Sequence, residues 1–188
     1  AQGLRSELKS IDAIQQGLNG AKGISRTAIA GATGVSNLLA DIRSKLTEMS
    51  SEGLTTAQRN ILNTDFNQLV SQAANFVANA SFNGVNLLTG TTGVNVLSNL
   101  AGGQLSLTAP TAVTVGNHTR SIAAATIATA TNAQSVIANE FSNLESVVNT
   151  ALGTLGAEVR ALDLQTTFLE QIRDASSEGL GNIVDSDL

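Results

Sequence analysis

Apolar or small side chains recur every three or four residues along the first fifty positions of the chain. The average step is about 3.5 residues, the repeat of a coiled-coil seam, so the pattern predicts one long helix over residues 3–52. The positions on this predicted seam are Leu4, Leu8, Ile11, Ile14, Leu18, Ala21, Ile24, Ala28, Ala32, Val35, Leu39, Ile42, Leu46 and Met49.

A break and a second, shorter helix follow. We expect Gly53 to end the first helix as its C-cap and Thr55 or Thr56 to begin the next as its N-cap. The second helix should span residues 57–79 and fold back antiparallel against the first. Its expected buried face consists of Ile61 or Leu62, Phe66, Leu69 or Val70, Ala73, Phe76 or Val77, and Ala80.

The segment over residues 91–125 changes to short runs in which apolar and polar positions alternate. Such alternation predicts two or three short β-strands, at residues 93–97, 104–108 and 112–115. The tripeptide Gly116-Asn117-His118 is interpreted as a turn. We expect a small hairpin patch packed on one end of the helix bundle.

A last helix is predicted from about residue 128 to Gly179, and it is expected to break or thin near Gly179-Leu180-Gly181. Its apolar positions follow alternating steps of four and three, and the polar residues Glu158 and Gln165 interrupt them. The expected seam of the bundle comprises Leu39, Ile42, Leu46, Ile137, Phe141, Leu144, Val148, Leu155, Leu162, Leu169 and Ile172.

These elements predict a mainly α fold: an elongated antiparallel bundle of long coiled-coil-like helices with a small β-hairpin patch. The helical core domain is expected to be discontinuous, over residues 1–90 and 126–188, and to be interrupted by the β-rich patch at 91–125. The chain begins inside a helical pattern, so we expect a fragment trimmed at both ends.

Five glycines lie inside the first predicted helix, at positions 17, 20, 23, 31 and 34. Each costs about 1 kcal/mol relative to alanine in a helix interior. Either the helix is kinked there, or other helices approach it closely along a face of small residues. We favour the second interpretation.

The stretch over residues 81–90 separates the helical arm from the β segment. Asn83-Gly84 is a turn dipeptide, because glycine reaches positive φ without penalty and asparagine tolerates it. Four apolar side chains lie close to this turn in the sequence: Phe82, Val85, Leu87 and Leu88. We therefore expect it to plug into the top of the bundle.

Composition excludes several functions. The ten Lys and Arg residues are scattered singly and the net charge is −5, so a nucleic-acid partner is not expected. No apolar run reaches the roughly 20 residues of a membrane span, so membrane insertion is not expected. Charged residues make up only 13% of the chain, which is low for a free monomer and more natural for a subunit packed among copies of itself.

Catalytic chemistry has few candidate residues. The chain has no Cys, and its single His, His118, falls in the predicted polar turn, where a solvated role is expected. A zinc site of the usual nitrogen and sulfur ligands cannot be built from these residues. We expect no enzymatic activity, no cofactor and no metal.

Several stretches of the chain resemble bacterial flagellins. The Phe82-Asn83-Gly84 turn followed by Leu87-Leu88 resembles a signature of that family, and the resemblance extends over roughly residues 1–97 and 127–188. The other similar stretches are Gly17-Leu18-Asn19, Ala28-Ile29-Ala30, Leu38-Leu39, Leu46, residues 69–80, Phe141-Ser142-Asn143-Leu144, Leu155-Gly156, Phe168 and residues 183–188. The β segment between them corresponds to the part that varies most in the family.

The resemblance implies a secreted, extracellular structural subunit that self-assembles into the bacterial flagellar filament for motility. The implied partners are copies of itself and the flagellar export, cap and junction proteins. A hook–filament junction protein is the nearest alternative. A cell-surface adhesin or carbohydrate-binding protein is another, but the chain has neither Trp nor Tyr for stacking on sugars and few cations for acidic polysaccharides.

Overall fold

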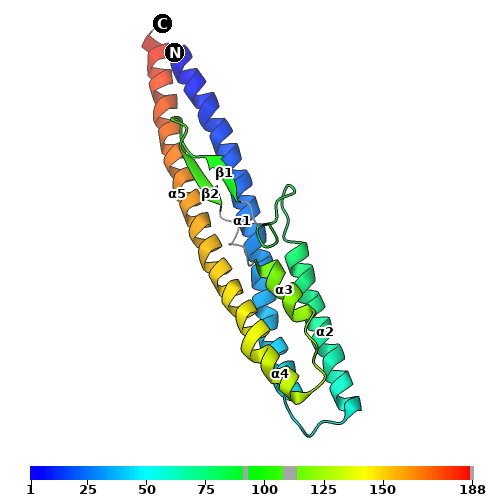
Figure 1. Cartoon of the computed structure of the whole chain (residues 1–188). Helices are drawn as coiled ribbons and strands as arrows, with labels where there is room; N and C mark the ends of the chain where they lie inside the picture. The colour runs from blue at the N-terminus through cyan, green and yellow to red at the C-terminus, as the bar shows by residue number, and fades with distance from the viewer. Residues whose placement is uncertain (91–92, 108–113, 187–188) are drawn as a thin grey trace.

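The computed structural model describes residues 1–90, 93–107 and 114–186. It is an elongated rod in which two long antiparallel helices lie side by side and both chain ends meet at the same end (Figure 1). The mainly α fold with a small two-stranded sheet is therefore confirmed. The elements are α1 (Gln2–Met49), α2 (Thr56–Ala78), β1 (Val94–Leu97), β2 (Gln104–Leu107), α3 (Val115–Ala123), α4 (Ala130–Val136), the π-helical turn η1 (Ile137–Phe141) and α5 (Ser142–Ser186).

The end of α1 differs from the prediction. Ser50 is the C-cap, with right-handed backbone angles, so the expected capping role of Gly53 is wrong. Thr55 begins α2 through a capping box, in which its hydroxyl accepts from the backbone N–H of Gln58 at 3.1 Å. The Arg59 guanidinium closes the connection by donating to the Met49 carbonyl at 2.6 Å. Hydrogen bonds from polar side chains, rather than a glycine cap, therefore stabilise the connection between α1 and α2.

The two long helices pack with their apolar seams facing each other. Twelve of the fourteen seam positions predicted on α1, from Ile11 to Met49, are buried. Across the interface Lys22 binds Asp163 at 3.0 Å and Arg173 binds Asp12 at 2.8 Å. Such partly exposed pairs contribute little energy, but their geometry identifies the antiparallel register of α1 and α5.

The β-hairpin lies along the side of the rod and not at its end (Figure 1). Its strands pair antiparallel with Val94 opposite Leu107, and β1 contacts α1 while β2 contacts α5. The Gln165 side-chain amide on α5 donates to the Ser98 carbonyl at the hairpin turn. The expected position at one end of the bundle is therefore wrong, because a polar residue within the seam anchors the hairpin midway along α5.

The prediction of a third strand at residues 112–115 is wrong for the two of these residues that the structure describes. Residues 112 and 113 lie outside the described residues, but Thr114 is an N-cap and Val115 begins helix α3. The predicted turn at Gly116-Asn117-His118 is likewise helical. The Thr114 hydroxyl accepts from the Asn117 N–H at 3.1 Å, and this cap starts a helix despite the alternating pattern. The range 91–125 therefore contains a helix as well as strands, and its domain boundaries stay a prediction.

The last helical arm begins at α4, passes through η1 and continues as α5. The predicted break at Gly179-Leu180-Gly181 is wrong, because α5 runs through these glycines to Ser186. A Cβ on Gly179 would lie 3.9 Å from Leu4 Cδ1, so α1 still accompanies α5 at this level. Neighbouring helical structure outweighs the low helix propensity of glycine here.

Candidate functional site

The turn at residues 82–85 is a tight reversal between α2 and the hairpin segment. The Phe82 and Val85 backbones exchange two hydrogen bonds, of 2.9 and 3.0 Å. Asn83 and Gly84 between them have φ of 49° and 78°. Positive φ at both central residues is the requirement of a type I′ turn, for which Asn-Gly is the preferred dipeptide.

Asn86 ties this turn to the end of α2. Its side-chain amide donates to the Val77 carbonyl at 2.8 Å, and its side-chain oxygen accepts from the Leu88 N–H at 2.9 Å. Leu87 and Leu88 are consequently buried in the core, while Phe82 is partly exposed. The turn packs against the middle of α1, since α2 is shorter than α1, and not on top of the bundle as expected.

Three of the α1 glycines make this packing possible. A Cβ on Gly23 would lie 2.5 Å from the Phe82 ring, and one on Gly34 would lie 2.8 Å from the Phe76 ring. At Gly31 the nearest atoms would be the Ala80 Cβ, at 2.6 Å, and a backbone carbonyl of α2. Close approach therefore accounts for these glycines, and the approaching groups belong to this chain itself.

Gly17 and Gly20 differ from the other three. A Cβ on either would have no atom within 4 Å among the described residues. Within this chain, neither close approach nor a break in α1 explains them.

The predicted seam residues occupy the interface between the helices. Leu39, Ile42 and Leu46 of α1 are buried, and Ile137 and Ile172 are only half-buried. The remaining predicted seam residues, all buried, are Phe141, Leu144, Val148, Leu155, Leu162 and Leu169. The predicted seam residues are thus buried apart from Ile137 and Ile172, which are half-buried.

A polar cluster borders the seam near η1. The Arg43 guanidinium lies 4.9 Å from the centre of the Phe141 ring, in cation–π geometry. The same guanidinium lies 3.5 Å from a Glu145 carboxylate oxygen. These contacts position η1 against α1.

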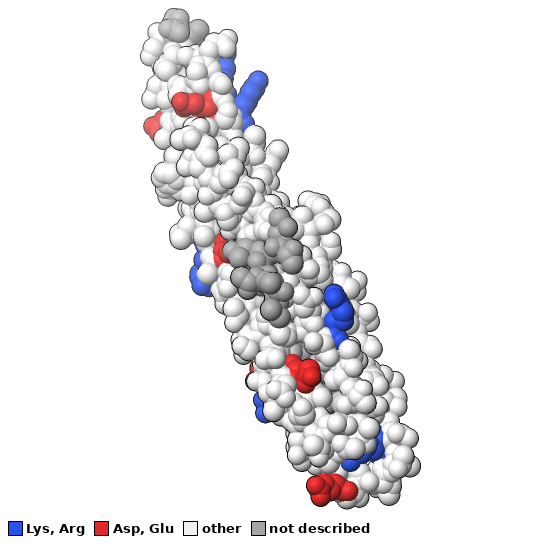
Figure 2. Space-filling view, in the orientation of Figure 1, with Lys and Arg blue, Asp and Glu red and all other residues white. Residues whose placement is uncertain are grey.

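The described residues offer surfaces for packing and no assembled reactive centre. No group of three or more His, Cys, Asp or Glu side chains in this part of the chain is placed to hold a metal ion. His118 is half-buried on α3 and not in the expected loop. Charged side chains are scattered over the face in Figure 2, with much uncharged surface between them. Among the described helices, none combines the length and apolar character of a membrane span.

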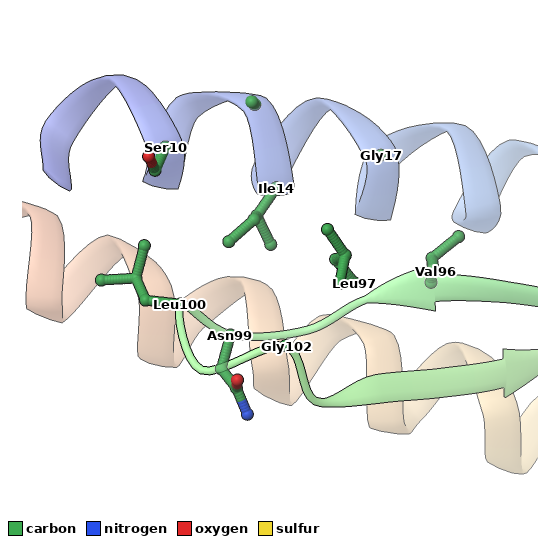
Figure 3. Close-up of a pocket in the computed structure, with 9 residues that line it drawn as sticks. Ser10, Ile14, Gly17, Val96, Leu97, Asn99, Leu100 and Gly102 are labelled. Atoms are coloured by element: carbon green, nitrogen blue, oxygen red, sulfur yellow. The ribbon is translucent and has the colours of Figure 1, made fainter. Parts of the chain in front are cut away.

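Two surface features were not predicted. Leu164 and Phe168 point away from the seam of α5 and are exposed, and a groove opens between α1 and the hairpin turn (Figure 3). The sequence does contain a pattern that indicates the exposed pair. Apolar residues form a second row on α5, at steps of four, three and four: Ala157, Ala161, Leu164 and Phe168. The groove has no sequence signal, because it depends on where the hairpin docks.

Comparison with known proteins identifies the family. The profile of the bacterial flagellin N-terminal helical region matches residues 1–92. Flagellin FljM of Caulobacter vibrioides is 32% identical over 180 residues, which cover 95% of this chain and 65% of the relative. The chain belongs to the bacterial flagellin family. Flagellin FljO of the same organism is 31% identical over the same shares, and a flagellin of Brucella melitensis is 26% identical over 100% of this chain and 70% of its own.

Solved structures share the flagellin fold. The crystal structure of Bacillus cereus flagellin matches with a TM-score of 0.69 and 20% identity, over 81% of this chain and 88% of that one. A putative flagellar hook-associated protein from Vibrio parahaemolyticus matches with a TM-score of 0.63 and 16% identity, over 100% and 95%. At such identities the matches establish the fold alone. The chain spans about 65% of the length of the Caulobacter flagellins.

Proposed function

We propose that this protein is a structural subunit that self-assembles into the bacterial flagellar filament, outside the cell, and serves motility. The observation that supports this most strongly is the alignment of 95% of the chain with flagellins at about 30% identity. The role is mechanical and not catalytic. The partners of the filament subunit are further copies of the same chain and, by the same reasoning, the flagellar export, cap and junction proteins.

The physical character of the rod supports this proposal. A stiff pair of helices of 48 and 45 residues presents a long, charge-poor side to neighbouring copies. Contacts between different faces of identical rods extend without closing, which produces filaments. In this proposal the Phe82-Asn83-Gly84 turn, together with Leu87 and Leu88, holds α2 against α1 and so keeps the rod rigid.

Electron microscopy tests the proposal. We would compare this chain with a version extended at both ends to the length of the Caulobacter flagellins. Both chain ends lie at one end of the rod, so the added segments would start side by side (Figure 1). We expect uniform filaments from the extended chain only.

A hook–filament junction role is the second candidate, favoured by the fold match to a putative hook-associated protein over the whole chain. It predicts that the extended chain forms no filaments by itself and instead binds purified hook or junction proteins. That result would replace the filament proposal.

A further inference from the structure

The last helical arm contains one turn that is not α-helical. α4, the π-helical turn η1 and α5 follow one another without a loop, and all three contact α1 (Figure 1). In a π turn each N–H bonds to the carbonyl five residues earlier, whereas in an α-helix it bonds to the carbonyl four residues earlier. A single π turn within a helix therefore contains one residue more than the α-helical turn that it replaces.

The spacing of the buried residues changes at this turn. In α4 the buried residues Ala130, Ala133 and Val136 follow one another at steps of three. After the turn, Phe141 and Leu144 begin a buried row that continues along α5 at steps of three and four. Between Val136 and Phe141 the step is five. The one irregular step in this part of the arm thus coincides with η1.

A regular α-helix would not bury both ends of this five-residue step on one side. At about 100° per residue, five residues turn the helix by about 500°, which ends about 140° away from the starting side. Four residues end only about 40° away, and the predicted seam accordingly contained Ile137. In the structure Ile137 is half-buried, whereas Val136 is only 4% exposed. The additional residue of the π turn accounts for this difference.

Contacts with α1 hold the arm on both sides of the turn. Before it, the Gln134 side-chain amide donates to the carbonyl of Ser50, the C-cap of α1, at 3.5 Å. At its end, the Arg43 guanidinium lies 4.9 Å from the centre of the Phe141 ring. Both segments are therefore fixed against the same helix, and the turn between them must match their rotations.

The additional residue lies on the solvent side of the arm. Ala138 and Asn139 are both exposed. The Asn139 side-chain amide donates to the Ser135 carbonyl at 2.8 Å, which is a contact within the arm itself. Removing Ala138 would therefore delete no buried side chain and would leave both partners of this hydrogen bond in place.

We propose that η1 is a one-residue insertion that sets the rotation of α4 relative to α5, so that both segments bury their apolar residues against the rest of the bundle. Without the additional residue the arm would be one uninterrupted α-helix, with Val136 and Phe141 four residues apart and the same side chains buried. This inference goes beyond the proposed function, because it concerns how a single chain folds, whether or not copies of it assemble.

Two single-residue deletions of exposed alanines test the inference. Deleting Ala138 removes the insertion, so the melting temperature should stay within about 3 °C of that of the unmodified chain or rise above it. Deleting Ala157, an exposed residue of α5 outside the π turn, is the matched control. It turns every later residue of α5 by about 100° and removes Leu162 and Leu169 from their buried positions. The melting temperature of this variant should fall by at least about 10 °C.

Thermal unfolding followed by circular dichroism measures both shifts, and NMR identifies the helix type at the deletion site. In the Ala138 deletion, nuclear Overhauser effects between each Hα and the amide proton four residues later should continue through the former turn. The proposal is overturned if the two deletions destabilise the protein equally or are tolerated equally. It is also overturned if the π turn persists after Ala138 is removed.

Discussion

Glycine positions in α1 separate into sites of contact and sites of open surface. At Gly23, Gly31 and Gly34 an aromatic ring or the α2 backbone occupies the space that a Cβ would need. The packing gained there offsets the cost of about 1 kcal/mol that each glycine imposes on a helix. The residue type alone does not distinguish these sites from Gly17 and Gly20.

The effect of a glycine-to-alanine substitution on the free energy of unfolding should therefore differ in sign between these two kinds of site. Gly31→Ala should lower the free energy of unfolding by about 1–3 kcal/mol, because the methyl group would meet a backbone carbonyl that cannot move away easily. Gly153→Ala, at a site with nothing within 4 Å, should raise it by about 0.5–1 kcal/mol. Urea unfolding followed by circular dichroism measures both. Equal effects at the two positions would refute the close-approach explanation for Gly31.

At the scale of the element, local capping decides structure where periodicity is ambiguous. Residues 112–115 alternate as a strand would, but Thr114 caps a helix whose first turn packs on Leu88 through a 2.9 Å hydrogen bond from the Gly116 N–H. Thr114 and Val115 are buried by this contact. The cap, this tertiary hydrogen bond and the packing of α3 against α2 and α5 together favour helix over strand in so short a segment.

Removing the cap of α3 should weaken this element. Thr114→Ala should destabilise the protein by about 1 kcal/mol, since the Asn117 N–H would lose its acceptor. Thr114→Ser is the matched control, because it retains the hydroxyl, and should recover most of the loss. Thermal unfolding of the two variants provides the measurement, and equal melting temperatures would contradict the capping role.

At the scale of the whole molecule, support for the long helices is uneven. Near η1, the α2, α3 and α4 helices surround α1 and α5, whereas at the chain ends α1 and α5 have only each other (Figure 1). The last residues of α5, 181–186, are all exposed. Local opening costs least where few apolar contacts must be broken.

Amide hydrogen exchange along α5 should be faster near the chain end, where fewer apolar contacts hold the helix. Amides of residues 181–186 should exchange at least about a hundredfold faster than that of buried Val148, because they open without disturbing the core. Exchange monitored by NMR or by mass spectrometry of α5 peptides measures the difference. Uniform protection along α5 would mean that the rod unfolds only as a single unit.

The sequence by itself determined the long helices, their antiparallel pairing, the Asn83-Gly84 turn and the first two strands. Each depends on local propensity or on a repeat that persists over many residues. Both can be recognised in the sequence without knowing which distant segments are in contact. Only the tertiary structure decided that α5 continues through Gly179, that α3 is helical, and where the hairpin lies. These outcomes depend on contacts between distant segments, such as Gln165 with Ser98, which no local pattern encodes. The same is true of the groove beside Gly17, whose walls come from two segments that meet only when the hairpin docks.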